Sequence, residues 1–173
     1  MLKRVQHDGR KKQGVIFLAP LFLSACGLQP MYAGGAQGVV AQGLAGVDVP
    51  AIAGKSGWLM RNALQDRLAA AGDKSATRYR LDVKLDDRLE GLGLRSDDTV
   101  ARERRTLRAR YQLVDLASGK ILLDATAGSD AGIDVVSSEY ATVAGEQTAL
   151  ENLTKLVADR IVTNLALTLR QQK

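Results

Sequence analysis

The chain has 173 residues, of which 46% are hydrophobic and 25% are charged, a composition typical of one globular domain. Of its net charge of +5, the first 25 residues supply +4, since they hold five cations and one carboxylate, and the remainder carries +1. A body so close to neutral removes the electrostatic case for nucleic-acid binding, and the composition is not that of a disordered chain.

The first 25 residues have the three parts of a secretory signal peptide. A basic stretch ends at Lys12, an apolar run extends from Gly14 to Leu23, and the small residues Ser24 and Ala25 follow. The apolar run has about ten residues, whereas a helix that crosses the hydrocarbon core needs roughly 20. We therefore interpret residues 1–25 as a signal peptide that is removed, in preference to a short buried helix of a cytosolic protein.

Cys26 is the only cysteine, so no internal disulfide can form. Residues 23–26 have the sequence Leu-Ser-Ala-Cys, which resembles the lipobox of bacterial lipoproteins. This resemblance implies that Cys26 carries a thioether-linked diacylglycerol and an N-acyl chain, with no other cofactor. Two or more acyl chains anchor a protein stably. Gly27 stands where aspartate would signal inner-membrane retention, so we expect the periplasmic side of the outer membrane.

The cleaved chain is predicted to begin with a flexible tether over residues 26–43, which are rich in Gly, Ala and Gln. A single folded domain is expected over residues 44–173. It starts with a short strand over 44–49. Ser56 is the expected N-cap of a first helix over about 57–71.

From Arg78 the apolar residues recur with a period of two, which predicts a strand with one buried and one exposed face. Glycines and short polar residues over 91–98 predict a connection, after which a second strand covers about 102–115. The loop 115–120 and a strand over 121–134 complete a hairpin.

A long amphipathic helix is predicted from Ser138 or Glu139 to about Arg170. Its buried face is expected to hold Val143, Leu150, Leu153, Val157, Ile161, Leu165 and Leu169. The order β-α-β-β-β-α predicts an α+β fold: a two-layer sandwich in which two helices pack on one face of a four-stranded mixed sheet.

The processed chain lacks the side chains of most catalytic sites. The only histidine, His7, lies in the signal peptide, and the only cysteine is the lipid site. This excludes Ser-His-Asp and Cys-His catalysis and zinc sites with such ligands, so we expect no enzyme and no metal. The carboxylate pairs Asp86-Asp87 and Asp97-Asp98 leave a glycan hydrolase as an alternative, since such enzymes use two carboxyl groups. However, the first pair lies on a predicted strand, where adjacent side chains point to opposite faces. The second pair has the composition of a turn.

Arginines are concentrated on the second long strand. The even-numbered ones share one face and are candidates for contact with lipopolysaccharide or a partner: Arg102, Arg104, Arg108 and Arg110. Guanidinium groups on an exposed face bind phosphate or carboxylate in bidentate fashion. The alternative, which we favour, is that Asp82 and Asp86 of the neighbouring strand neutralise them, although four cations then face two carboxylates.

Several motifs together resemble the LPS-assembly lipoprotein LptE family. In chain order they are Cys-Gly-Leu-Gln-Pro-Met-Tyr at 26–32, Arg-Tyr-Arg-Leu at 78–81, Glu-Gly-Leu-Gly at 90–93 with Asp-Asp-Thr at 97–99, Ala-Arg-Tyr-Gln-Leu-Val-Asp at 109–115 and Ser-Glu-Tyr-Ala-Thr at 138–142. The family's fold, two helices on a four-stranded mixed sheet, agrees with the predicted element order.

The resemblance implies a structural role in the outer membrane. A member of this family occupies the lumen of the β-barrel LptD, assists its assembly and contacts lipopolysaccharide on its way to the cell surface. The alternative is a periplasmic lipoprotein of a lipid-transporting ABC system, which would use the same anchor and a similar body.

Overall fold

The computed structural model describes residues 38–72, 76–94 and 100–172, which belong to one compact unit, Met31–Lys173. The predicted signal peptide 1–25, its cleavage site and Cys26 lie outside the described residues, and so does most of the predicted tether. No helix within the described ranges is both long and apolar enough to cross a membrane.

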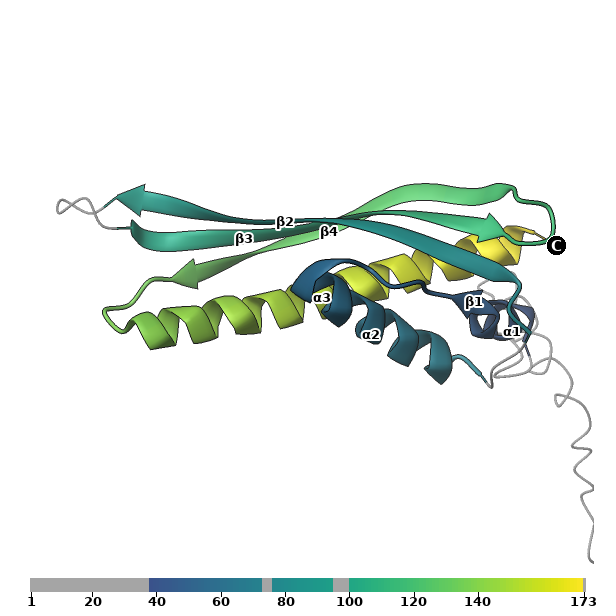
Figure 1. The fold of residues 1–173 in the computed structure, drawn as a ribbon, viewed down its shortest axis with the longest axis horizontal. Coiled ribbons are helices and arrows are strands. Elements are labelled where there is room, and N and C mark those ends of the chain that lie inside the picture. The colour runs from purple at the N-terminus through teal and green to yellow at the C-terminus, as the bar shows by residue number, and fades with distance from the viewer. Residues whose placement is uncertain (1–37, 73–75, 95–99, 173) are drawn as a thin grey trace, which may run out of the picture. The chain divides into compact units, whose positions relative to one another are not determined.

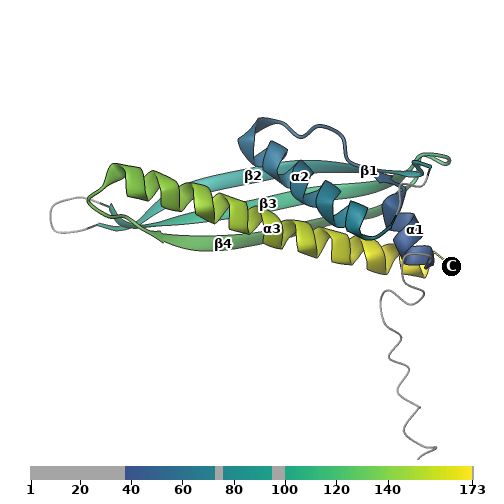
Figure 2. The same cartoon turned by 90° about the horizontal axis from the view of Figure 1, so that it is seen from below.

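Two layers make up the described part of the chain, with all helices on one side of a four-stranded sheet (Figures 1 and 2). The elements are α1 Val39–Ala45, β1 Val47–Asp48, α2 Gly54–Ala70, β2 Tyr79–Leu94, β3 Val100–Asp115, β4 Ile121–Asp134 and α3 Glu139–Gln171. The strands lie in the order β1-β2-β3-β4; β1 pairs parallel to β2, and the other pairs are antiparallel. The predicted α+β sandwich with a mixed sheet is confirmed, with α1 as an additional helix.

The core lies between the sheet and α3, where both patterns predicted from the sequence are confirmed. The odd-numbered residues of β3 from Leu107 to Leu113 are buried, and so are Tyr79 and Leu81 of β2. Opposite them α3 buries Leu150, Leu153, Val157, Ile161, Leu165 and Leu169. Full burial of one such side chain contributes about 1.5–3 kcal/mol, so this seam holds the layers together.

Helix α3 begins as predicted but presents a different face in its first turns. The Ser138 hydroxyl accepts a hydrogen bond from the Ala141 N–H at 3.4 Å, and Glu139 in the first turn suits the helix dipole. Val143 was expected in the core, yet it is 55% exposed. Gly145 lies next to Ile133 instead, because the sheet twists along the straight helix and meets another side of it.

The tether prediction fails at its last residues, since 39–43 belong to α1 and only Val47 and Asp48 form the first strand. Val40, Ala41 and Leu44 are buried, and Gly43 lies against Leu169 near the end of α3. The small side chains that suggested a tether allow this helix to pack closely on α3. The packing depends on a residue far along the chain, which local composition does not reveal.

Helix α2 starts earlier than predicted, with Ala53 and not Ser56 as its N-cap and without a side-chain cap. The approach of Ile52 sets this start, because a Cβ on Gly57 would lie 2.5 Å from the Ile52 carbonyl oxygen. The buried face is as predicted, with Met60, Leu64 and Leu68 in the core.

Strand β2 continues through the predicted connection as far as Leu94. Gly91 pairs with Glu103 and Leu92 with Arg102, so the long partner strand extends the ladder past the glycines that suggested a turn. The predicted hairpin loop 115–120 and the strand 121–134 are confirmed.

Candidate functional site

The face of the sheet turned away from the helices, here called the outer face, is charged along its length. It consists of the even-numbered residues of β2 and β3 and the residues of β4 in register with them. Its side chains include Arg80, Asp82, Lys84, Asp86, Arg88 and Glu90 on β2, Arg102, Arg104, Arg108 and Arg110 on β3, and Asp124, Asp130 and Asp134 on β4. Because cations and carboxylates nearly balance, the pairing of each arginine decides where an anion can bind.

Two of the four predicted arginines are neutralised by carboxylates of β4. The Arg110 guanidinium donates to Asp124 at 3.2 and 2.9 Å, and the Gln112 amide donates to the same carboxylate at 2.7 Å. Arg102 lies 3.2 Å from Asp134 in a second ion pair. The hydrogen bond from Arg110, followed by that from Gln112, holds the pKa of Asp124 below its ordinary value, so this pair is charged at neutral pH.

The predicted pairing with Asp82 and Asp86 is wrong. Asp82 accepts hydrogen bonds from Arg80 at 3.0 and 3.1 Å, and Asp86 accepts one from Arg88 at 2.9 Å. Both pairs join residues two apart on one strand, which point to the same face and lie within the reach of an arginine side chain.

Arg104 and Arg108 are exposed, and neither forms an ion pair with another residue of the described ranges. Their neighbours on β4 are Gly132 and Gly128, which provide no carboxylate. Arg108 lies over Gly128, where a Cβ would come within 3.1 Å of its Cγ. These two guanidinium groups therefore present unused donors beside two glycines of β4, with Asp130 on the same face between the glycines.

Arg104 and Arg108 are not in a purely basic setting, since Glu90 and Asp86 stand opposite them on β2. Asp86 is occupied by Arg88, whereas Glu90 is exposed beside Arg104. An anion bound at Arg108 would thus face a carboxylate that is already neutralised, whereas one bound at Arg104 would be repelled by Glu90.

The fifth arginine of the cluster, Arg105, points to the helix side. Its guanidinium donates to both carboxylate oxygens of Asp87, at 2.9 and 2.8 Å, and to the Glu146 carbonyl oxygen of α3 at 3.2 Å. The hydrogen bond to Asp87 raises the pKa of Arg105. The alternation predicted from the sequence is confirmed, and this arginine joins the two layers.

The two adjacent carboxylates of β2 do not form a catalytic pair. Asp86 lies on the outer face with Arg88, and Asp87 lies on the helix side with Arg105. Asp97 and Asp98 lie outside the described residues. Across 38–72, 76–94 and 100–172, no three His, Cys, Asp or Glu side chains gather as metal ligands do.

The analysis of the sequence missed the carboxylates of β4. Asp124, Asp130 and Asp134 lie on the outer face together with the arginines of β3, and two of them pair with arginines there. Their even spacing within the predicted strand was available as a signal, but the assignment considered only the strand before the arginines.

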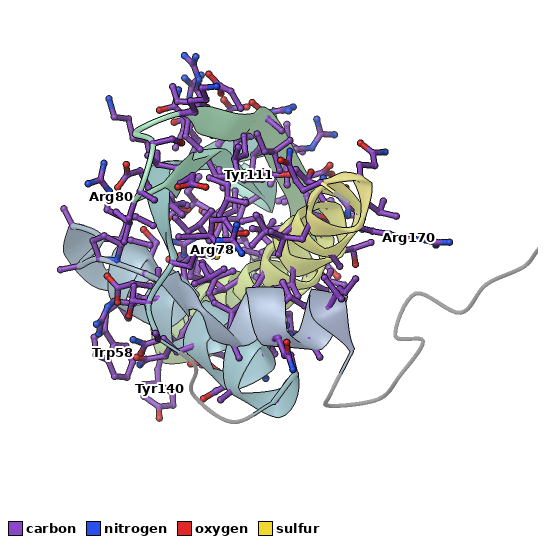
Figure 3. The ribbon with its side chains drawn as sticks, turned by 90° about the vertical axis from the view of Figure 1, so that its right-hand side faces the viewer. Trp58, Arg78, Arg80, Tyr111, Tyr140 and Arg170 are labelled. Carbon is purple, nitrogen blue, oxygen red and sulfur yellow. The ribbon has the colours of Figure 1, made fainter. Side chains whose placement is uncertain are left out.

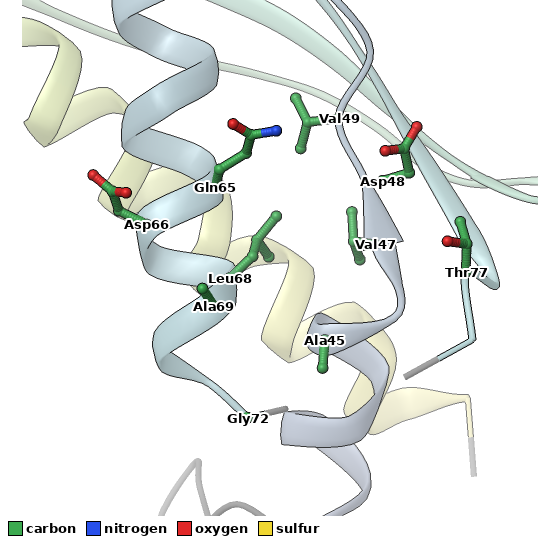
Figure 4. Close-up of a pocket in the computed structure, with 10 residues that line it drawn as sticks. All are labelled: Ala45, Val47, Asp48, Val49, Gln65, Asp66, Leu68, Ala69, Gly72 and Thr77. Carbon is green, nitrogen blue, oxygen red and sulfur yellow. The ribbon is translucent and has the colours of Figure 1, made fainter. Parts of the chain in front are cut away.

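A separate cavity of about 380 Å³ lies between the α1–β1 segment and α2 (Figure 4). Val47, Val49 and Leu68 form its apolar lining, and Asp48 and Asp66 lie on its two walls. Its one hydroxyl, that of Thr77, forms no hydrogen bond with Asp48 or Asp66, so the lining holds no activated nucleophile and the outer face remains the candidate site.

Comparison with known proteins gives one family and a group of similar structures. Residues 44–165 match the family LptE, described as lipopolysaccharide-assembly. No curated protein matches the chain.

Three solved structures are similar in fold. A protein described as a lipoprotein from Caulobacter crescentus has a TM-score of 0.64 at 25% identity, and the match covers 79% of this chain and 98% of that one. A minor lipoprotein from Acinetobacter baumannii has a TM-score of 0.55 at 14% identity, with 70% and 88% covered. The rare lipoprotein B from Shewanella oneidensis has a TM-score of 0.50 at 16% identity, with 70% and 92% covered.

Proposed function

The chain belongs to the LptE family of lipopolysaccharide-assembly lipoproteins, and from that premise we propose that it is a lipid-anchored subunit of the outer-membrane machinery for lipopolysaccharide. In this role it occupies the lumen of the LptD β-barrel, assists assembly of the barrel and contacts lipopolysaccharide during delivery to the cell surface. The observation that carries the proposal is the family match over residues 44–165.

The shape of the described domain supports a role in fitting against a larger partner. Strands β2 and β3 have 16 residues each, and α3 has 33, so the two layers form an elongated body. A strand of this length extends roughly 53 Å at about 3.3 Å per residue. The core seam makes this body stiff, which suits a plug and a folding scaffold for a barrel.

We propose that Arg104 and Arg108 are the lipopolysaccharide contacts of the outer face. Both guanidinium groups lack a carboxylate partner among the described residues, and guanidinium binds phosphate with two parallel hydrogen bonds. Arg102 and Arg110 contribute less, because Asp134 and Asp124 already occupy their donors.

We also propose that the lipid on Cys26 holds the protein at the periplasmic side of the outer membrane, with no catalytic activity and no further cofactor. Several acyl chains on one residue give stable anchoring, since each buried methylene contributes about 0.8 kcal/mol. Replacement of Cys26 by Ser removes the lipid site and leaves the described domain unchanged.

Depletion in the native host tests the function. Loss of the protein should lower the amount of lipopolysaccharide at the cell surface and leave newly made lipopolysaccharide in the inner-membrane fraction. Re-expression of the wild type should restore delivery, whereas Cys26→Ser should restore it poorly. If depleted cells keep a normal amount of surface lipopolysaccharide, the proposed function is wrong.

A further inference from the structure

Strand β4 forms one edge of the sheet along its whole length. It is the last strand in the order β1-β2-β3-β4, so no described strand pairs with its outer side. The Gly128 carbonyl oxygen accepts a hydrogen bond from the Arg160 guanidinium of α3, an exposed side chain that the N–H of an added strand can replace. An open edge of 14 residues is a template for pairing with another strand.

The outer face of β4 alternates between glycines and carboxylates near the end of the strand. Its residues from 128 to 134 on this face are Gly128, Asp130, Gly132 and Asp134. Asp130 is exposed and forms no ion pair within the described ranges. Asp134 pairs with Arg102, and its side chain is still 78% exposed. The edge therefore carries carboxylate charge that the described domain neutralises only in part.

Arginines of β3 lie beside these glycines. Arg104 is in register with Gly132, and Arg108 with Gly128. The Arg108 side chain leans over Gly128, because a Cβ there would lie 3.1 Å from the Arg108 Cγ. Strands lie about 4.8 Å apart, so a carboxylate one strand beyond β4 starts roughly 10 Å from the arginine Cα. An arginine and an aspartate side chain together span this distance, provided that the residue between them is a glycine.

A second copy of β4 supplies such carboxylates in one register. Consider two β4 strands that pair antiparallel with Ala131 opposite Ala131. Each aspartate then stands opposite a glycine of the other copy, so that Asp130 reaches Arg104 and Asp134 reaches Arg108. Moving the axis by one residue sets Asp130 opposite either Asp130 or Asp134, and like charges directly opposite are destabilising. The edge is thus complementary to itself in charge and shape.

Apolar side chains that the domain leaves exposed lie next to this ladder. Val136 is 49% exposed, Tyr140 85% and Val143 55%. They lie where β4 ends and α3 begins (Figure 1), and Tyr140 points away from the body (Figure 3). In the register about Ala131, the second copy's strand continues past Asp134 and runs beside Val136. Pairing therefore covers part of this apolar surface.

We propose that the protein forms a twofold dimer in which the β4 strands of two copies pair antiparallel about Ala131. The ion pairs of Arg104 with Asp130 and of Arg108 with Asp134 cross the interface and fix its register. Each pair occurs twice, because a twofold axis makes the same patch of both copies meet.

This inference goes beyond the proposed function and does not rest on it. A barrel lumen receives one body, so the dimer is the form of the protein before it meets the barrel. Pairing shields the open edge from other chains during that time. A ladder of seven residues makes a small interface, and small interfaces are weak and transient, so the dimer gives way to a larger partner. Dissociation then frees Arg104 and Arg108 for lipopolysaccharide.

Cysteine crosslinking tests the dimer. The full chain carries Cys26→Ser, so that an introduced cysteine is its only thiol, and it is purified in mild detergent. Ala131→Cys lies on the proposed axis, where directly opposite Cβ atoms are about 4.5–5.5 Å apart. Ala117→Cys in the exposed loop 115–120 is the matched control. Oxidation should form disulfide-linked dimers several-fold faster at position 131 than at position 117, although position 117 is the more exposed.

Charge reversal tests the register. Asp130→Arg, added to Ala131→Cys, sets a cation against Arg104 of the other copy and should lower the rate of crosslinking several-fold. Further addition of Arg104→Glu exchanges the charges of the pair and should restore the rate. Both positions are exposed, and an unchanged circular dichroism spectrum confirms that the variants fold.

Equal rates at positions 131 and 117, or a fast rate at 131 that survives Asp130→Arg, would overturn the dimer. Neither measurement involves a barrel or lipopolysaccharide, so these results would leave the proposed function in place.

Discussion

Arg105 of β3 donates two hydrogen bonds, of 2.9 and 2.8 Å, to the Asp87 carboxylate of β2 on the helix side of the sheet. The two side chains are 16% and 18% exposed, and the same guanidinium reaches the Glu146 carbonyl oxygen of α3. Arg104, one residue earlier, is exposed on the outer face. The alternation of a strand thus separates a structural arginine from a candidate binding arginine.

Replacement of Arg105 by Ala should destabilise the domain. The change leaves the largely buried Asp87 carboxylate without its partner, which costs about 1–3 kcal/mol. Urea unfolding followed by circular dichroism measures the loss. Arg104→Ala is the matched control and should stay within about 0.5 kcal/mol of the wild type, as exposed substitutions do. Equal losses for the two variants would contradict the assignment of Arg105 to the scaffold.

Replacement of both Arg104 and Arg108 by Ala should weaken binding of purified lipopolysaccharide. A hydrogen bond to a charged group contributes about 1.5 kcal/mol, so roughly tenfold weaker binding per arginine is expected at low salt. The difference should shrink as salt screens the charges. The double variant Arg102→Ala with Arg110→Ala removes the same charge from positions that already have a carboxylate partner. It should bind lipopolysaccharide more tightly than the Arg104 and Arg108 double variant does. The reverse order would assign the contact to the paired arginines.

The link between α2 and α3 predicts a pH dependence. Arg67 donates hydrogen bonds to both oxygens of Asp159 and to the Lys155 carbonyl oxygen, and the hydrogen bond from Arg67 lowers the pKa of Asp159. A lowered pKa in the folded state stabilises the fold above the ordinary carboxyl value of about 3.9, and this stabilisation is lost as pH falls through the folded value.

Asp159→Asn should therefore lose up to about 1 kcal/mol of stability at neutral pH, because solvent screens the pair at Asp159, whose side chain is 61% exposed. The difference from the wild type should be smaller at about pH 3, below the ordinary carboxyl pKa of about 3.9, because the unfolded chain then takes up a proton that the folded carboxylate, with its lowered pKa, resists. Urea unfolding at the two pH values measures it. A difference that stays constant or grows in acid would mean that the pair does not act through its charge.

Two glycines in helices should respond in opposite directions to replacement by Ala. A Cβ on Gly57 would lie 2.5 Å from the Ile52 carbonyl oxygen, so Gly57→Ala should destabilise the domain by about 1–3 kcal/mol. Gly145→Ala should stabilise it by about 0.5–1 kcal/mol, because its Cβ meets Ile133 at an ordinary 3.4 Å and helix propensity improves. Thermal unfolding measures both changes. A neutral Gly57→Ala would show that Ile52 does not set the start of α2.

Element boundaries were predicted best where a periodic pattern of apolar residues ends at a turn or a capping residue. The hairpin of β3 and β4 and the long helix α3 were predicted almost to the residue, because strict alternation and helical spacing end at the loop and at Ser138. Helix α1 was not predicted because it has only seven residues, too few to show a helical period. Contact between Gly43 and Leu169, which are far apart in the sequence, stabilises it.

At the candidate site, alternation predicted which arginines share a face but not which strand supplies their partners. Arg110 has neighbours on both β2 and β4, and only the structure shows that Asp124 of β4 lies within hydrogen-bond distance. The intrastrand pair of Asp86 and Arg88 likewise depends on side-chain reach. Pairing therefore needs the structure, whereas the choice of face does not.

Copurification tests the proposed function most directly. The full chain, expressed in its native host with a C-terminal tag, is crosslinked in the cells and purified in mild detergent. We predict that one large outer-membrane β-barrel is recovered with it in equal amounts, together with lipopolysaccharide, and that Cys26→Ser reduces this recovery. Recovery of the chain alone, or with an inner-membrane ABC complex in place of the barrel, would contradict the proposed role in lipopolysaccharide assembly.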